Sequence, residues 1–170
     1  VQLLKGIEVE ILENGRLDLP DRILRQLDLV IGSVHSHFRL PVQQQTERIL
    51  RAMDQHYFSI LGHPSGRLIN EREPYAVDMA AVIQKAKERG SFLELNANPQ
   101  RLDLNETYCQ MAKAAGVLVA INTDAHSVAE FDQIAYGISQ ARRGWLEKKD
   151  VLNARPLREL LKLLKRTMGK

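Results

Sequence analysis

The chain has 170 residues, of which 44% are hydrophobic, and this is enough for one globular domain with a sizeable core. Its 24 Lys and Arg residues against 21 Asp and Glu residues leave a net charge of +3, which is too small to indicate nucleic-acid binding from overall charge. The single cysteine, Cys109, excludes an intramolecular disulfide, and without an apolar run of membrane-spanning length or a signal sequence we expect a cytoplasmic protein that does not bind membranes. Because the chain begins with Val1 rather than Met, close to a predicted strand, we also expect a segment before it.

Short apolar runs alternate with longer helical patterns along the chain. The predicted strands cover 6–12, 27–34, 58–61, 92–95 and 117–121. The predicted helices cover 46–57, 77–89 and, at the carboxyl end, the amphipathic stretch 156–168 with a solvated basic face. Two helices, the one at 77–89 and one that ends before Gly116, close with a basic residue and then a glycine, Gly90 or Gly116, just before a strand. Strands joined by crossover helices are parallel, so the pattern predicts an α/β fold, either a barrel or a doubly wound sheet.

Polar residues follow three of the predicted strands, and they include four of the five histidines. The residues are His35, His37, His63, Asp124 and His126. The carboxyl ends of parallel strands meet on one face, and Glu8 in the first strand adds a carboxylate. Imidazoles and carboxylates together are the ligands of Zn, Mn or Fe sites. One such histidine is more often an ordinary hydrogen-bonding residue, but three recurrences at equivalent strand ends favour a metal site.

Several arginines lie in or near the loops that follow these strands. Arg39, Arg67, Arg72 and Arg101 are candidates for binding phosphate through two parallel hydrogen bonds, although solvated loop arginines are at least as common. His37, beside the candidate ligands, contacts either substrate or a ligand.

The remaining polar residues have a less specific pattern. Glu94, Asn96 and Asn98 follow or end a strand, where they either orient ligands or water or simply form turns and caps. His56 has no partner motif nearby and is interpreted as structural. Cys109 lies in a helical pattern without a nucleophile motif, which favours core packing.

Five motifs, in this order, resemble those of the polymerase and histidinol phosphatase (PHP) superfamily. They read Gly-Ile-Glu-Val-Glu-Ile at 6–11, Ser-Val-His-Ser at 33–36, Gly-His-Pro at 62–64, Leu-Glu-Leu-Asn-Ala-Asn-Pro at 93–99 and Asn-Thr-Asp-Ala-His-Ser at 122–127. Arg67, Arg-Leu-Asp-Leu at 101–104 and Ala-Arg-Arg-Gly-Trp-Leu at 141–146 are similar to runs in the PHP domain at the carboxyl end of bacterial and archaeal family X DNA polymerases. The resemblance covers nearly the entire chain.

The resemblance implies one PHP domain over 1–170, built as a distorted barrel of seven βα units and incomplete at its N-terminal strands. It implies up to three divalent metal ions, Mn or Zn, with Glu8 bridging two of them and His35 and His63 completing one. Asp124 then serves the other bridged metal and His126 a third. These five ligands are also the expected catalytic residues. The family's opening His-x-His motif and a further histidine belong before residue 1, so two of the metals are expected to lack ligands.

By resemblance, the expected activity is that of a metal-dependent phosphoesterase, a hydrolase that removes nucleotides from DNA 3′ ends during repair. The expected partners are a DNA 3′ end or another phosphate ester, and upstream polymerase domains in the intact chain. Phosphate would be bound by His37, Arg39, Arg67 and Arg101. Two alternatives remain: a histidinol-phosphatase-like phosphomonoesterase, and a catalytically incomplete structural or DNA-binding module. Because ligands are expected before residue 1, this stretch alone is expected to be a poor phosphoesterase.

Overall fold

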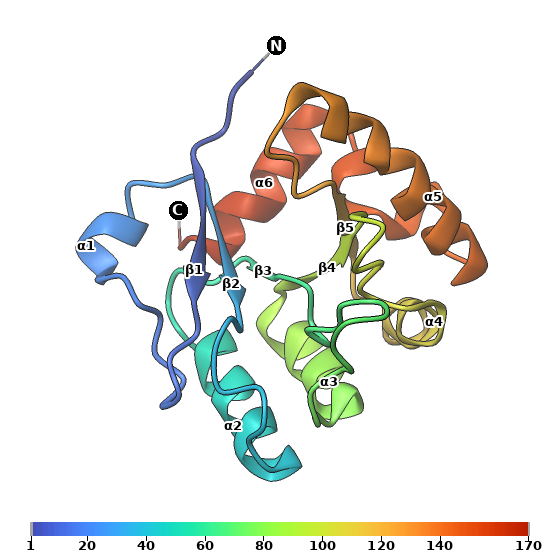
Figure 1. The fold of residues 1–170 in the computed structure, drawn as a ribbon. Coiled ribbons are helices and arrows are strands. Elements are labelled where there is room, and N and C mark those ends of the chain that lie inside the picture. Colours follow the sequence, from blue (N-terminus) through green and yellow to red (C-terminus); the bar gives the residue numbers. More distant parts are fainter. Residues whose placement is uncertain (1, 170) are drawn as a thin grey trace.

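A computed structural model describes residues 2–169 as an α/β arrangement around a single sheet (Figure 1). The strands are β1 (Gly6–Glu10), β2 (Leu29–Ser33), β3 (Ile60–Leu61), β4 (Phe92–Asn96) and β5 (Val119–Asn122). The α-helices are α1 (Asp21–Leu24), α2 (Val42–Met53), α3 (Met79–Arg89), α4 (Glu106–Ala115), α5 (Ile134–Arg143) and α6 (Leu157–Thr167). Short 3-10 helices are η1 (Val128–Gln133), η2 (Lys148–Asp150) and η3 (Leu152–Ala154).

The sheet is parallel throughout, and its strands follow one another in the order β1-β2-β3-β4-β5. A doubly wound sheet reverses its strand order at a switch point, and this sheet has none. Each crossover instead advances by one strand, as in part of an α/β barrel. Of the two architectures that sequence periodicity left open, the strand order is consistent with part of a barrel, while the number of units in a closed barrel remains a prediction.

Both faces of the sheet are buried along β3, β4 and most of β5, which explains why these strands read as apolar runs rather than as alternating patterns, whereas Gly6, Ile7 and Glu8 of β1 are exposed. Neighbouring residues along each strand enter different clusters. Leu61, Leu93 and Val119 pack in the larger core with residues of α2, α3 and α4. Ile60 and Phe92 join a smaller cluster that includes residues of α6. Three polar residues lie on the α6 side of the sheet, toward its carboxyl end: Glu8, Glu94 and Asn122. Each of them either pairs with a residue of the smaller cluster or lies two positions after one along its own strand.

The helix boundaries follow from capping. Asp78 accepts a hydrogen bond from the Ala81 amide at 3.0 Å and starts α3, and Gly90 ends it with a φ of 67°. The helix predicted at 46–57 begins and ends four residues earlier, at Val42 and Met53. The Thr46 hydroxyl lies inside α2 and donates to the Val42 carbonyl at 2.7 Å.

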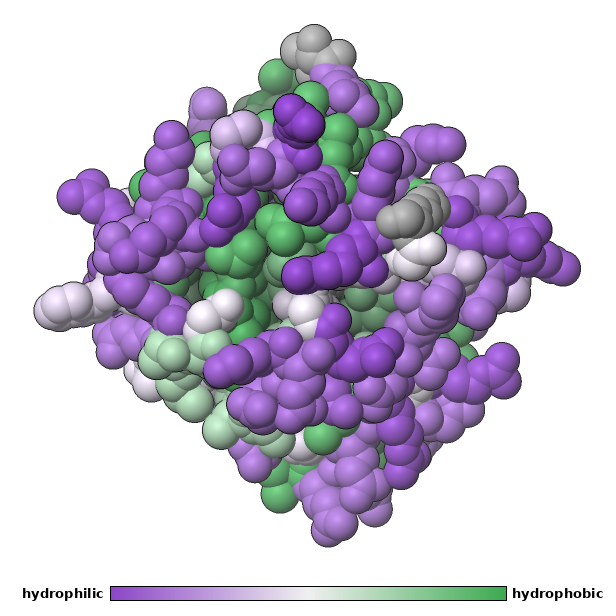
Figure 2. Space-filling model, turned by 180° about the vertical axis from the view of Figure 1, so that it is seen from behind, coloured by the Kyte–Doolittle hydropathy of each residue, from purple (hydrophilic) through white to green (hydrophobic). Residues whose placement is uncertain are grey.

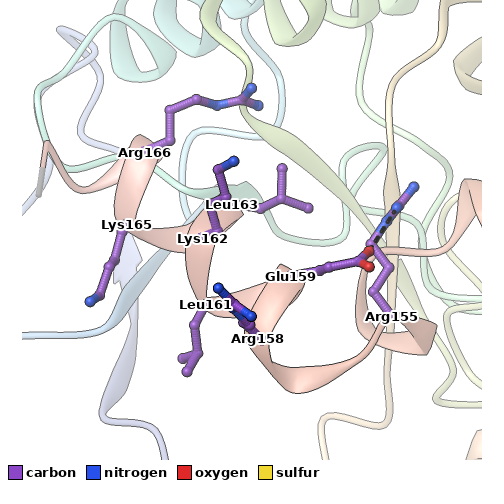
Figure 3. Close-up of a pocket in the computed structure, with 8 residues that line it drawn as sticks. All are labelled: Arg155, Arg158, Glu159, Leu161, Lys162, Leu163, Lys165 and Arg166. Atoms are coloured by element: carbon purple, nitrogen blue, oxygen red, sulfur yellow. Dashed lines mark ion pairs between the residues drawn. The ribbon is translucent and has the colours of Figure 1, made fainter.

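The carboxyl-terminal helix α6 covers one face of the sheet with its leucines and turns basic side chains outward. Figure 3 shows the side chains around a groove of about 920 Å³ on this helix, with Arg155 Nη1 3.6 Å from Glu159 Oε2. Arg158, Lys162 and Lys165 are exposed. The face of the molecule opposite to that in Figure 1 is largely polar, with apolar surface near its centre (Figure 2). Among residues 2–169, no helix has the length and apolar character that a membrane crossing requires.

Candidate metal centre

Three predicted ligands meet at the carboxyl ends of β1, β2 and β3. Glu8 lies within β1, whereas His35 and His63 lie just beyond the ends of β2 and β3. The Nε2 atoms of His35 and His63 are 3.0 Å and 2.8 Å from the same atom, Oε1 of Glu8. The two imidazole rings meet edge to face, with centroids 5.2 Å apart. Parallel strands thus bring together residues that are far apart in the sequence.

Glu10, two residues after Glu8 on the same face of β1, orients His35. Its Oε2 atom accepts hydrogen bonds from the His35 Nδ1 at 2.8 Å and from the His35 main-chain amide at 2.9 Å. A proton held on Nδ1 leaves Nε2 as the nitrogen that can bind a metal. Sequence reasoning did not assign Glu10 a role, although the Glu-Val-Glu spacing in a strand places both carboxylates on one face.

Arg48 of α2 is the second residue that the sequence analysis missed. Its side chain is completely buried and its guanidinium donates to Glu10 Oε1 at 3.0 Å and to the Ser36 carbonyl at 2.9 Å. It also donates to the carbonyls of Ile11 and Leu12, just after β1. Arg48 therefore ties the chain after β1 to the chain after β2. The available signal was its place on the apolar side of an amphipathic helix, next to the buried Ile49.

His63 is held by its main chain. The residue is 2% exposed, and its amide donates to Oε2 of the buried Glu94 at 2.7 Å. Its Nδ1 atom is buried and has no hydrogen-bond partner among residues 2–169. His37, His63 and Asp124 have φ values of 54°, 27° and 54°, which makes them three of the six non-glycine residues with positive φ in the described chain. Backbone strain of this kind persists only where the surroundings enforce it, and it often marks functional sites.

A buried polar network connects His63 to Asp124. Glu94 Oε1 accepts from the Asn122 side-chain amide at 2.8 Å. The Asn96 side-chain amide donates to Asp124 Oδ2 at 3.2 Å and lies 3.5 Å from Glu94 Oε2. Burial of Glu94 raises its pKa, although the Asn122 hydrogen bond opposes this shift. The two asparagines therefore support the site, which is one of the two roles the sequence had left open for Asn96.

Asp124 and His126 lie at the end of β5 and not in the three-residue cluster. Among residues 2–169, the group whose ligand atoms all lie within 4.8 Å of one another consists of Glu8, His35 and His63. His126 is exposed, and its Nδ1 is 2.8 Å from the carbonyl of Asp124. The structure thus brings three of the five predicted ligands into one group and connects the fourth through Asn96.

Electrostatics favour an ionised carboxylate at the centre of the cluster. Desolvation opposes ionisation of Glu8, but the hydrogen bonds from His35 and His63 outweigh it and hold its pKa well below the usual value. The hydrogen bond to Glu8 is also the main reason why the pKa of His35 is raised, against the effect of its own burial. In the absence of a metal, a proton on His35 therefore competes with a cation for the same position.

The donor atoms fit a divalent transition metal. Two imidazole nitrogens and one carboxylate oxygen match the ligand set of catalytic sites that keep a further position open. With metal–ligand distances of about 2.0–2.2 Å, neighbouring donors lie about 3.0–3.5 Å apart around an ion. The separations of 2.8–3.0 Å between Glu8 Oε1 and the two imidazole nitrogens differ from these values by only a few tenths of an ångström, and all three donors lie within 4.8 Å of one another. Glu8, His35 and His63 would therefore hold such an ion without rearrangement of the strands.

The predicted phosphate-binding residues have different surroundings. Arg101 is the one beside the network: its Nε is 3.9 Å from Asp124 Oδ2, and its buried Nη1 has no hydrogen-bond partner among the described residues. Arg67 donates to the carbonyls of Arg101 and Leu102, so its guanidinium is engaged by the loop. Arg39 is exposed.

Two other candidates lie to the side of the cluster. His37 Nδ1 is 3.7 Å from Glu13 Oε2 at the surface. Arg72 stacks on the Phe38 ring at 3.9 Å and donates to the Gly66 carbonyl at 2.9 Å. Cys109 and His56 stay outside the site: the thiol is buried in the core, and His56 packs edge to face on Tyr57.

Glu10→Gln is expected to weaken the binding of Mn²⁺ or Zn²⁺ by about 10- to 100-fold, because the side chain that fixes the His35 ring loses its charge. Titration calorimetry with the metal alone measures the affinity. Glu13→Gln is the matched control, since Glu13 is exposed and contacts none of the three ligands in the described structure. Equal affinities for the two variants would contradict a positioning role for Glu10.

The fold and the cluster define an α/β protein with a candidate metal centre at the ends of its strands. The chain is 42% identical over 165 residues to the DNA polymerase/3′-5′ exonuclease PolX of Bacillus subtilis, covering 97% of this chain and 29% of that protein. It is 33% identical over 181 residues to a probable phosphatase of Thermoanaerobacter sp. strain X514, covering 99% of this chain and 71% of that protein. A probable phosphatase of Caldanaerobacter subterraneus is 37% identical over 146 residues, which are 78% of this chain and 55% of that protein.

No protein-family model matches the chain, so its membership follows from these relatives. The chain belongs to the polymerase and histidinol phosphatase family, and its similarity to PolX corresponds to the carboxyl-terminal PHP domain of family X polymerases. The chain spans less than a third of PolX and just over half of the Caldanaerobacter protein.

Proposed function

We propose that this chain is the phosphoesterase part of a metal-dependent enzyme that removes nucleotides from the 3′ ends of DNA. The observation that carries the proposal is the convergence of Glu8, His35 and His63 at the ends of three parallel strands. The 42% sequence identity to PolX, which is named as a 3′-5′ exonuclease, extends over 97% of this chain and supports DNA as the substrate. Upstream polymerase domains would then be partners in the same polypeptide.

The five predicted ligands would hold different metal ions. Glu8, His35 and His63 would hold one ion, and Asp124 and His126 would contribute to further ions. When bound, a divalent cation supplies Lewis-acid stabilisation of the charge that develops on the phosphoryl group. Manganese and zinc both suit nitrogen and oxygen donors of this kind.

Arg101 is best placed to bind a phosphate oxygen, because its Nη1 has no hydrogen-bond partner among residues 2–169 and its side chain lies next to Asp124. Arg67 would then act indirectly, by shaping the loop that carries Arg101. His37 and Arg39 remain candidates for contacts with the rest of the substrate.

A second candidate function is hydrolysis of a small phosphomonoester. It is favoured by the probable phosphatase of Thermoanaerobacter, 71% of whose length this chain matches. Both functions use the same ligands and the same cation, so they differ only in what is attached to the phosphate. Assaying a single-stranded oligonucleotide against small phosphomonoesters with one Mn²⁺-loaded preparation separates them.

The decisive experiment compares this chain with a longer one that carries the preceding segment. We expect both to bind metal and the longer chain to hydrolyse 3′ ends several orders of magnitude faster, because each 1.4 kcal/mol of lost transition-state stabilisation costs about tenfold in rate. Elemental analysis after Mn or Zn loading gives the metal content, and release of labelled 3′ nucleotides gives the rate. Equal rates would contradict the need for further ligands, and absence of metal in both chains would contradict the metal centre itself.

A further inference from the structure

A cavity of about 450 Å³ opens at the carboxyl end of β5, next to Asp124. It is lined by Ile121, Asn122, Thr123, Asp124, Phe131 and Ile134. One wall is therefore polar and contains Asp124, which the polar network links to His63. The lining also includes two apolar residues, Phe131 of η1 and Ile134 at the start of α5. Its volume lies in the range of about 300–1,000 Å³ that is typical of small-molecule sites.

The aromatic side chain in this cavity is unusually exposed. Phe131 is 63% accessible to solvent, although it could bury far more apolar surface by packing inward. The neighbouring Glu130 is held in place, because its carboxylate accepts hydrogen bonds from the His126 amide at 2.6 Å and the Ser127 hydroxyl at 3.0 Å. The loop that carries Asp124 and His126 is thus fastened to the segment that carries the ring.

We propose that Phe131 forms a stacking wall for the terminal nucleobase of the substrate, an inference that rests on the proposed phosphoesterase function. A phosphate at the Asp124 end of the cavity places the rest of its nucleotide in the same space as the Phe131 ring. Aromatic side chains stack on every base without reading its sequence, as an enzyme acting on arbitrary ends requires. The substrate class is therefore an unpaired terminal nucleotide, and not a phosphomonoester with an aliphatic body.

Binding can be tested without catalysis. The probe is single-stranded DNA with 2-aminopurine at its 3′ end, whose fluorescence is quenched when the base stacks. We expect quenching on binding to the wild-type chain and an affinity about fivefold to a hundredfold lower for Phe131→Ala, with Phe131→Trp retaining the tighter binding. Val128→Ala is the matched control, because Val128 lies in the same 3-10 helix, is 85% exposed and does not line the cavity. Equal quenching for the wild-type chain and Phe131→Ala would overturn the proposal.

A kinetic comparison then separates this inference from the proposed function. The oligonucleotide ends either in a normal nucleotide or in an abasic residue, and the longer, more active chain is used. Phe131→Ala should raise KM for the normal end by about fivefold to a hundredfold and leave the abasic end unaffected. Equal losses on both ends would overturn the stacking role while hydrolysis itself still supports the phosphoesterase. In a further outcome, the chain hydrolyses neither end, but the wild-type chain quenches the 2-aminopurine fluorescence and Phe131→Ala does not. That outcome would overturn the proposed function and still support the stacking site.

Discussion

Replacing His63 with Ala is expected to abolish detectable binding of Mn²⁺ or Zn²⁺ by this chain. His63 contributes one of three donor atoms, and its loss leaves a carboxylate and one imidazole, too few to hold a transition metal tightly. The dissociation constant should rise by more than about 100-fold, beyond the effect of removing a residue that only supports a ligand. Elemental analysis after dialysis and calorimetric titration measure the two quantities.

His56→Ala is the control for this experiment. His56 is an exposed histidine that packs on Tyr57 and takes no part in the cluster, so its loss should leave the metal content unchanged. Circular dichroism should show that both variants keep the wild-type fold. Metal retained by His63→Ala, or lost equally from both variants, would show that the cation binds elsewhere.

Arg48→Met is expected to lower the free energy of unfolding by about 3–5 kcal/mol, the usual cost of removing one partner of a buried ion pair. The guanidinium is completely buried, and its removal takes one donor from Glu10 Oε1 and the side-chain donor from the carbonyls of Ile11 and Ser36. Urea unfolding followed by circular dichroism gives the change.

Arg51→Met is the matched control, because Arg51 lies one turn further along α2 and its side chain is 60% exposed. Its ion pair with Glu47 is a surface i,i+4 pair, whose loss costs about 0.5 kcal/mol or less. Similar losses of stability in the two variants would mean that Arg48 acts only as another surface charge. The contrast tests burial alone, since residue type, helix and substitution are the same.

The parts of the fold that could be predicted depend on local patterns. The strands β3 to β5 were recognisable because both of their faces are largely buried, and α3 and α4 end where Gly90 and Gly116 take positive φ. The start of α2 was placed four residues too late, at Thr46, because residues 42–45 carry only one apolar side chain and fall outside the apolar repeat. Strand order came only from the pairing itself, which no local pattern specifies.

The candidate site could be predicted in its ligands but not in its supports. His35 and His63 stand out in the sequence because they follow strands, and parallel topology makes strand ends converge. Arg48 and Glu10 act through contacts across 38 positions of sequence, and a buried arginine has no signature that distinguishes it from a solvated one. Arg67 is the opposite case. Its place in a loop after a strand suggests phosphate binding, but its guanidinium already donates hydrogen bonds to two main-chain carbonyls.

The segment after β3 shows that the metal ligands and the acids that fix the position of His63 come from different parts of the chain. Pairing in β3 stops at Leu61, and beyond it three main-chain amides donate to buried acids: that of His63 to Glu94, and those of Ser65 and Gly66 to Asp103. All three donors of the cluster lie within the first 63 residues, whereas both acids come from β4 and the loop that follows it. A truncated chain that stops before β4 would thus possess every ligand and still be unable to shape the loop that presents His63. The smallest unit able to form this centre is accordingly set by the acids, not by the ligands.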